Sequence, residues 1–165
     1  MPMIREAVES DLSAIVQIYN EAVVGRKATA DLDPISIESR LTWFYEHTPQ
    51  SYPIWVLEKE GHIAAWLSIQ RFHPRPAYAA TAELSIYVSP LCQQQGMGTM
   101  LLQHAIAKSP TLGIKTLVGL IFAHNEPSLK LFERFHFSEW GYLPGVAELD
   151  GVERDLVIMG RRLRS

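Results

Sequence analysis

A glycine-containing turn, Gln93-Gln94-Gln95-Gly96-Met97-Gly98-Thr99, could bind an anion through its backbone. It follows an alternating apolar and polar strand that ends before Pro90, and an apolar run of helical spacing begins at Met97. Glycines leave the backbone N–H groups unshielded, and amides that converge at a helix N-terminus form a phosphate site. The sequence therefore predicts that a phosphorylated ligand lies beside this strand.

Three charged residues outside the turn are candidates for the remaining chemistry. Glu83 lies among apolar residues of the preceding strand, where a raised pKa would let a carboxylate accept a proton through water, so we interpret it as the catalytic base. The guanidinium of Arg75 could bind a substrate carboxylate with two hydrogen bonds. Arg134 is a weaker substrate candidate. A solvent-facing glutamate and solvated arginines are the alternatives.

The whole chain sets limits on these interpretations. Its 165 residues, 47% of them hydrophobic, fit a single domain over residues 1–165. A net charge of −3 without a basic run argues against a nucleic-acid partner. The single cysteine, Cys92, permits no internal disulfide and fits the cytoplasm. No apolar run approaches the roughly 18 residues of a membrane span, and the histidines lack metal-ligand spacing, so we expect neither membrane nor metal binding.

Helical and alternating patterns then place the elements that hold these residues. Strands are expected at residues 3–7, 53–57, 63–71, 81–88, 115–122, 137–143 and 154–161, the last two around a turn at Asp150-Gly151. Helices are expected from Ser10 to about Val24, from Ser36 to about His47, from Gly96 to about Lys108, and after Asn125. This order indicates an α/β or α+β fold with mixed strand directions.

The glycine turn lacks two familiar phosphate motifs. The Walker sequence G-x-x-x-x-G-K-[ST] does not occur, and G-x-G-x-x-G is broken by Leu101. The remaining pattern, Gln93-x-x-Gly96-x-Gly98, resembles the [RQ]-x-x-G-x-[GA] element of the GNAT acetyltransferases, where the turn holds the pyrophosphate of acetyl-CoA. Taken alone, a tight turn that caps a helix would explain the same residues.

Further segments extend the resemblance over nearly the whole chain. Asn125-x-x-Ser128 matches the N-x-x-[AS] pattern of GNAT enzymes. Three segments resemble the phosphinothricin and methionine sulfoximine or sulfone acetyltransferases: residues 75–88, Ile18-Tyr19-Asn20-x-Ala22-Val23 and Arg40-x-x-Trp43-Phe44. The resemblance implies a mixed, largely antiparallel sheet with helices on both faces, splayed at the acetyl-CoA site. It also implies a homodimer.

The resemblance also assigns roles to residues of this sequence. Acetyl-CoA, the co-substrate, would contact Ile86, Tyr87, Val88, Gln94, Gln95, Gly96, Met97, Gly98, Thr99 and Asn125. The amine substrate, a small amino acid or analogue, would contact Arg75, Pro76, Ala77, Glu83, Leu84, Ser85 and Arg134. For Asn125, a plain helix N-cap is an equally good explanation, and both roles can hold at once.

Two positions depart from the family pattern. Phe132 replaces a tyrosine whose hydroxyl can protonate the leaving thiolate, so the general acid must be water or another residue. His136 replaces a closing glycine, a poorer choice if the position requires positive φ. Two alternatives to a small-molecule acetyltransferase stay open: an enzyme acting on protein N-termini or lysines, and a CoA-binding module without catalysis.

Overall fold

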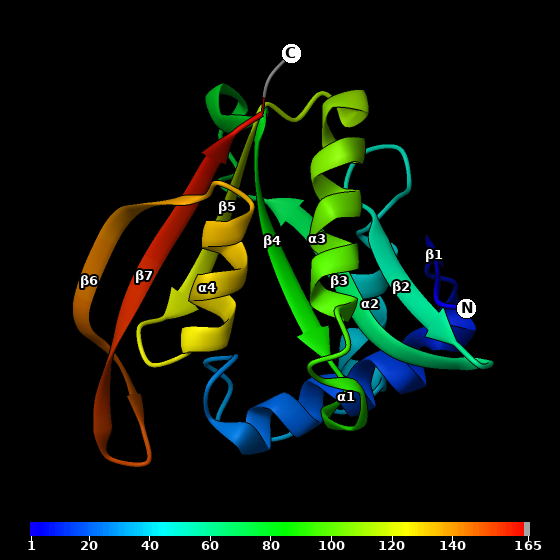
Figure 1. Cartoon of the computed structure of the whole chain (residues 1–165), viewed down its shortest axis with the longest axis horizontal. Helices are drawn as coiled ribbons and strands as arrows, with labels where there is room; N and C mark the ends of the chain where they lie inside the picture. The colour runs from blue at the N-terminus through cyan, green and yellow to red at the C-terminus, as the bar shows by residue number, and fades with distance from the viewer. Residues whose placement is uncertain (164–165) are drawn as a thin grey trace.

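The computed structural model describes residues 1–163 and is built around one seven-stranded sheet (Figure 1). The strand order is β1-β2-β3-β4-β5-β7-β6, and every neighbouring pair is antiparallel except β4 and β5. The strands are β1 (Met3–Glu6), β2 (Ile54–Lys59), β3 (His62–Arg71), β4 (Thr81–Val88), β5 (Thr116–Phe122), β6 (Ser138–Leu149) and β7 (Val152–Arg162). The helices are α1 (Leu12–Gly25), α2 (Leu41–Tyr45), α3 (Met97–Lys108) and α4 (Glu126–Arg134).

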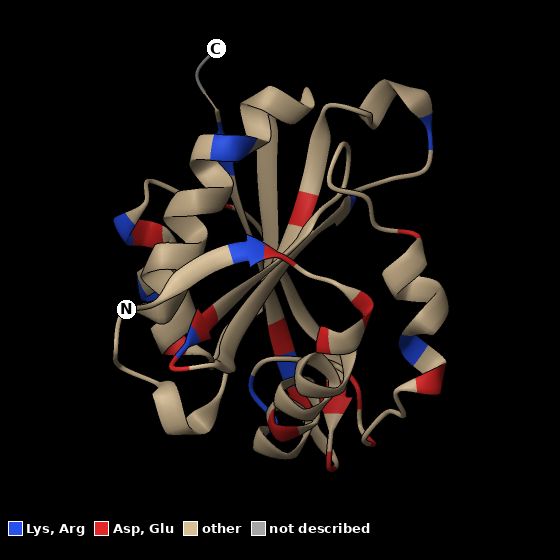
Figure 2. Cartoon of the chain, turned by 90° about the vertical axis from the view of Figure 1, so that its right-hand side faces the viewer, with Lys and Arg blue, Asp and Glu red and all other residues tan. Residues whose placement is uncertain are grey.

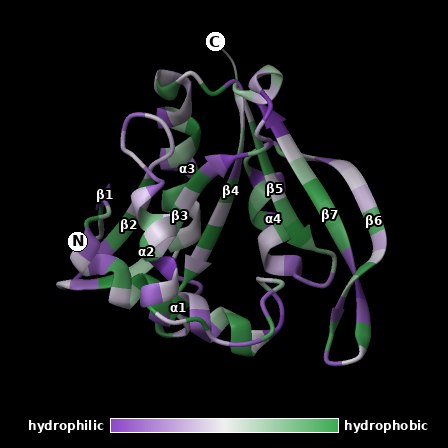
Figure 3. Ribbon diagram, turned by 180° about the vertical axis from the view of Figure 1, so that it is seen from behind, coloured by the Kyte–Doolittle hydropathy of each residue, from purple (hydrophilic) through white to green (hydrophobic). Residues whose placement is uncertain are grey.

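The helices cover both faces of the sheet, because the strands are apolar on both sides. Along β2, Trp55 and Leu57 contact the core under α3 and α4, whereas Ile54 and Val56 contact the core under α1 and α2. Seen from behind, α1 crosses the lower end of the sheet and α2 lies over its β2–β3 half (Figure 3). The predicted fold class, a mixed and largely antiparallel sheet between helices, is confirmed.

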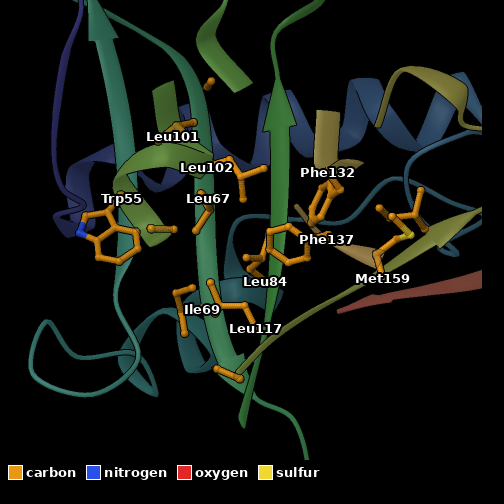
Figure 4. Packing of buried hydrophobic residues seen from close by; sticks show 14 of the residues in the cluster. Trp55, Leu67, Ile69, Leu84, Leu101, Leu102, Leu117, Phe132, Phe137 and Met159 are labelled. Atoms are coloured by element: carbon orange, nitrogen blue, oxygen red, sulfur yellow. The ribbon is translucent and has the colours of Figure 1, made fainter. Parts of the chain in front are cut away.

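The larger core joins α3 and α4 to the sheet. Ten of its side chains, from every part of this layer, are labelled in Figure 4: Trp55, Leu67, Ile69, Leu84, Leu101, Leu102, Leu117, Phe132, Phe137 and Met159. Phe132 and Phe137 meet edge to face with their centroids 4.9 Å apart. This packing fixes α3 and α4 relative to β4, the strand that carries the predicted base, Glu83.

The sheet opens between its two central strands. Parallel pairing of β4 with β5 covers only Thr81–Thr116, Ala82–Leu117 and Glu83–Val118. Beyond Glu83, β4 continues to pair with β3 and β5 continues to pair with β7, but they no longer pair with each other. The second half of β4 therefore has backbone groups on one side that a ligand can use, which is the predicted splay.

Element boundaries differ from expectation in three places. Ser10 does not cap α1, because Asp11 accepts a hydrogen bond from the Val8 amide and a 3-10 turn precedes Leu12. The second helix is much shorter than predicted, and Ser36 instead accepts from the amide of Ser39 in a 3-10 turn. The last two strands are longer, because bulges let β6 follow β7 up to the turn at residues 150–151.

Candidate active site

The turn before α3 presents backbone amides rather than charge. Gln94 and Gly96 both have positive φ, 63° and 79°, which reverses the chain directly before the helix. The first α-helical hydrogen bond runs from the amide of Met100 to the carbonyl of Gly96. The amides of residues 97–99 therefore have no partner within the helix. The only charged residue of α3 is Lys108, in its last turn (Figure 2).

Gly98 contributes to this site through packing. A Cβ atom at position 98 would lie 3.2 Å from Cδ2 of Leu131 on α4. The glycine thus allows α3 and α4 to approach closely, in addition to baring its own amide. A larger side chain at position 98 would disturb this packing as well as ligand binding, so Gly96, which has open space around it, gives the cleaner test of the turn.

Arg134 lies on the α3–α4 side of the sheet. Its guanidinium Nη2 donates to the hydroxyl of Thr99 over 3.5 Å, next to the unpartnered amides of α3. Glu83 projects from the other face of the sheet. The structure therefore brings Arg134 together with the predicted cofactor residues and not with the other predicted substrate residues.

The three cofactor residues on β4 divide between the two faces. Ile86 and Val88 pack against the core under α3 and α4, and Tyr87 packs against the core under α1. All three lie beyond Glu83, in the part of β4 that no longer pairs with β5. Because the backbone groups of a strand point alternately to its two neighbours, some of these groups face the opening.

Asn125 and Phe132 belong to α4. Asn125 Oδ1 accepts from the Ser128 amide over 3.4 Å, so its role as helix N-cap is confirmed. Phe132 is only 4% exposed, and a Cβ atom added at Gly119 would lie 2.8 Å from its ring. Gly119 thus makes room for this ring against β5. His136, at the end of α4, has φ of 65°, so the position does require the left-handed conformation.

Glu83 sits where the sheet opens. Its partner across the β3–β4 ladder is Gln70, so the two side chains lie next to each other on the same face of the sheet. Burial raises the pKa of Glu83 above its ordinary value, and the hydrogen bond from Gln70 partly opposes this shift. The side chain of Leu84 is 2% exposed and lies in the opposite core, which leaves only its backbone for a substrate.

An aromatic and charged cluster lies on the same face of the sheet as Glu83. Tyr19 packs against Trp66 and, edge to face at 5.2 Å, against Tyr87. The guanidinium of Arg40 lies 4.7 Å from the Tyr19 ring centroid and 5.1 Å from that of Trp43. We call Tyr19, Asp31, Arg40, Trp43, Trp66 and Tyr87 the aromatic cluster.

Hydrogen bonds attach the loop after α1 to this cluster. The Tyr19 hydroxyl donates to Asp31 and lies 2.6 Å from the Thr29 hydroxyl. Asp31 is also 3.8 Å from Arg40. Burial raises the pKa of Tyr87, so the phenol stays protonated over the whole physiological range. Apart from Tyr87, which was predicted to contact the cofactor, sequence reasoning did not assign the cluster to the site, although Tyr19, Arg40 and Trp43 lie in two of the segments that carry the family resemblance.

Arg75, Pro76 and Ala77 lie on an exposed turn between β3 and β4. The backbone amide of Arg75 donates to Nδ1 of His73 over 3.2 Å. Among residues 1–163, no hydrogen bond or ion pair joins the guanidinium to Glu83. The turn leads into Thr81, two residues before Glu83, so Arg75 lies near the end of β4 that carries the carboxylate.

The segments that form this site match the sequence model of a known family. The sequence model of the acetyltransferase (GNAT) family matches residues 12–137, which include the glycine turn, Glu83 and Asn125. The chain belongs to the GNAT acetyltransferase family. GNAT membership makes the protein an N-acetyltransferase, and the non-catalytic alternative is not supported.

Individual GNAT proteins are similar to this chain over almost its full length. A Bacillus subtilis protein, provisionally named a phosphinothricin acetyltransferase, is 50% identical over 161 residues, covering 97% of this chain and 98% of its own. The L-methionine sulfoximine/L-methionine sulfone acetyltransferase of Pseudomonas paraeruginosa is 32% identical over 94% of this chain and 91% of its own. A crystal structure of a Sinorhizobium meliloti phosphinothricin acetyltransferase with acetyl-CoA has a TM-score of 0.93 at 29% identity, covering 98% and 88%.

Acetyl-CoA is the cofactor of this GNAT enzyme, and the residues present fit it. The amides of residues 97–99 can receive a pyrophosphate, and the unpaired half of β4 can pair with the amides of pantetheine. In the described part of the chain, no group of three or more His, Cys, Asp or Glu side chains is arranged to hold a metal ion. None of the helices in residues 1–163 has the length and apolarity of a membrane span.

Proposed function

We propose that this enzyme acetylates the amino group of a small amino acid or amino-acid analogue of the phosphinothricin, methionine sulfoximine or methionine sulfone type. The observation that carries this proposal is the half-buried Glu83 carboxylate, at the point where β4 and β5 separate. The relatives named for these substrates support the substrate class.

Glu83 would act as the general base through a water molecule. An amine attacks only as the free base, so an ammonium must first lose a proton. A buried carboxylate with a raised pKa is a better proton acceptor near neutral pH than an ordinary glutamate. Acetyl-CoA supplies the thioester carbon that the amine attacks. Phe132 has no proton to offer, so water or another residue would protonate the leaving thiolate.

Cofactor binding would use the α3–α4 side. The amides of Gln94 to Thr99 would hold the pyrophosphate, and the backbone of residues 86–88 would pair with pantetheine. The side chain of Asn125 would contact the same arm. Arg134, beside Thr99, would bind a cofactor phosphate rather than the amine substrate, because it lies on the opposite side of the sheet from Glu83.

Arg75 would bind the carboxylate of the amino acid. It lies in the exposed turn that leads into β4, and a guanidinium binds a carboxylate with two parallel hydrogen bonds. Pro76, Ala77 and Ser85 would complete the substrate contacts from the same turn and from the Glu83 face of β4.

A substrate panel tests the proposal. Thiol release from acetyl-CoA would be measured with methionine sulfoximine, phosphinothricin, their carboxylate esters and peptides with a free N-terminus. We expect the free acids to exceed the esters by more than about tenfold in kcat/KM, since an unpaired charge in a binding site costs a few kcal/mol. Arg75→Ala should remove this preference, whereas Arg71→Ala, whose guanidinium lies 5.9 Å from the Tyr52 ring, should keep it.

Equal kcat/KM for acid and ester in the wild-type enzyme would overturn the amino-acid assignment. Strong activity on peptides instead would establish the protein acetyltransferase alternative. The homodimer and the cytoplasmic location stay predictions from the family resemblance and the cysteine content. Light scattering after size exclusion tests the dimer, for which exposed Trp140, Tyr142 and Val146 on edge strand β6 offer apolar surface.

A further inference from the structure

A short polar ladder runs beside Glu83 on the face of the sheet that carries the aromatic cluster. Ser68 and Gln70 are on β3, two residues apart and therefore on the same face. Across the β3–β4 pairing, Gln70 is opposite Glu83 and Ser68 is opposite Ser85. Directly opposed residues of antiparallel strands have Cβ atoms about 4.5–5.5 Å apart, close enough for an amide to reach a carboxylate.

The hydrogen bond from Ser68 decides how the Gln70 amide points. The Ser68 hydroxyl donates to Oε1 of Gln70 over 3.1 Å, and Ser68 is only 2% exposed, which leaves its hydroxyl little access to water. With its oxygen engaged in this way, the group of the Gln70 amide that is left for a neighbour is Nε2, a hydrogen-bond donor. A carboxylate, which only accepts hydrogen bonds, is the matching partner.

We propose that Gln70, oriented by Ser68, is a positioning residue that holds the Glu83 carboxylate in its ionised, proton-accepting form. The inference rests on the proposed function of Glu83 as base. Hydrogen bonding to the charged form of a carboxyl favours that form, and burial disfavours it. Gln70 therefore counteracts the burial of Glu83 and engages one carboxylate oxygen, which leaves the other for water.

The surroundings of Glu83 provide few competing charges. From β5 its neighbour is Val118, and no ion pair of the described residues includes Glu83. The titratable and charged groups on the β3–β4 part of this face include His47, which follows α2, Tyr87 on β4, and Tyr19, Arg40 and Asp31 in the aromatic cluster. Burial lowers the pKa of His47, so it is neutral near pH 7, and Arg40 is paired with Asp31. The polar side chain directly opposite the carboxylate on β3 is that of Gln70.

Two readouts test the proposal on the full chain. The first is an NMR titration of the glutamate side-chain carboxyl carbons, with Glu83→Gln identifying the Glu83 signal. The second is the pH profile of kcat/KM for acetyl transfer. The variants are Gln70→Leu, Gln70→Met and Ser68→Ala. Gln103→Leu, the same change at an exposed position of α3, is the matched control.

We expect the Gln70 variants to titrate Glu83 at higher pH than the wild type, and Ser68→Ala to shift it less in the same direction. On the acidic limb, kcat/KM should fall about threefold to tenfold for Gln70→Leu and about twofold for Ser68→Ala, and the alkaline plateau should change less. Gln103→Leu should match the wild type. Gln70→Met keeps the length of the side chain and serves if Gln70→Leu does not fold.

An unchanged Glu83 titration in both folded Gln70 variants would overturn the positioning role. A loss of activity that is equal at every pH would also overturn it, because a structural defect lowers kcat/KM without shifting the acidic side of the pH profile. Failure of the proposed base is a separate result: Glu83→Gln with wild-type turnover would remove Glu83 from the mechanism, while the NMR titration would still report whether Gln70 stabilises the carboxylate.

Discussion

The two faces of the sheet offer different chemical groups to a ligand. On the α3–α4 face, the predicted cofactor site consists of backbone groups: the amides of residues 97–99 and the unpaired half of β4. On the α1–α2 face, the proposed acceptor site consists of side chains, namely Glu83, the polar ladder of Ser68 and Gln70, and the aromatic cluster. One face needs particular backbone conformations, and the other needs particular functional groups.

The two faces should therefore respond differently to mutation. A backbone site tolerates side-chain changes but fails when φ or the space around the amides changes. A side-chain site fails when one functional group is removed, even if the new side chain has the same shape. Substitutions can therefore separate cofactor binding from acceptor chemistry, and the four that follow are ordered from the largest expected effect to the smallest.

Glu83→Gln should give the largest effect. It keeps the shape and removes the proton acceptor, so kcat should fall by about 10²–10⁴, the range typical of general base catalysis. Because burial raises the pKa of Glu83, wild-type activity should be lost as pH falls through a range above that of an ordinary glutamate. The activity of the variant should not show this decrease at low pH.

The measurements are thiol release against pH and acetyl-CoA binding by calorimetry. Acetyl-CoA affinity should stay at the wild-type value, because Glu83 lies on the other face. Glu148→Gln, an exposed carboxylate on β6, should behave as wild type. Loss of acetyl-CoA binding in Glu83→Gln would contradict the separation of the two faces.

Gly96→Ala should break the cofactor face. At φ of 79° a side chain strains the turn that aligns the amides, so the Kd for acetyl-CoA should rise at least tenfold, equivalent to about 1.4 kcal/mol. Gly113→Ala is the matched control, since Gly113 has φ of 81°, has equally open surroundings and lies after α3. Both variants should lose about 1 kcal/mol of stability, but only the first should lose affinity. Equal affinities by calorimetry would place the phosphate site elsewhere.

Tyr19→Phe should act on the acceptor face alone. Removing the hydroxyl releases Asp31 and Thr29, which it ties to α1, at a cost of about 1 kcal/mol in stability. We expect KM for the amine substrate to rise about threefold to tenfold, with the acetyl-CoA Kd unchanged. Tyr142→Phe removes a comparable Tyr–Asp hydrogen bond, to Asp155 on the β6–β7 hairpin, and should leave both constants alone. A KM effect of equal size in the two variants would argue against the aromatic cluster.

His136→Gly should give the smallest effect, and a favourable one. The histidine has φ of 65°, which glycine adopts without steric cost, so the free energy of unfolding should rise by about 0.5–1 kcal/mol. Urea denaturation measures the change, and kcat should stay the same because His136 lies at the far end of α4 from Asn125. A lower midpoint would show that the imidazole makes a stabilising contact.

The two faces also differed in how far the sequence predicted them. The glycine turn, the helix after it and the Asn125 cap are local patterns, so short stretches of sequence were enough to locate them. The opening of the sheet after Glu83 and the left-handed φ at position 136 came from the family resemblance. All of these lie on, or lead to, the cofactor side.

The acceptor side depends on pairs that are distant in sequence. Gln70 meets Glu83 only because the β3–β4 register places them opposite each other, and alternation alone does not give the register. Tyr19 lies on α1 and Tyr87 lies on β4, so the sequence around one of them does not predict its contact with the other. Arg134 was a weaker substrate candidate from its place on the helix after Asn125, and its position beside Thr99 depends on how α4 packs against α3. Tertiary contacts decided each of these cases.

The strand order has a consequence for how the chain is completed during synthesis. β7 follows β6 in the sequence but lies between β5 and β6, so β5 gains a full-length neighbour only when β7 is made. Strands β1 to β4 pair with sequence neighbours or near neighbours and can associate while the ribosome is still adding residues. Until β7 emerges, both sides of β5 beyond Val118 are open edges, which attract other chains. The strand that borders the opening for acetyl-CoA, β5, is therefore also the strand whose pairing is completed last.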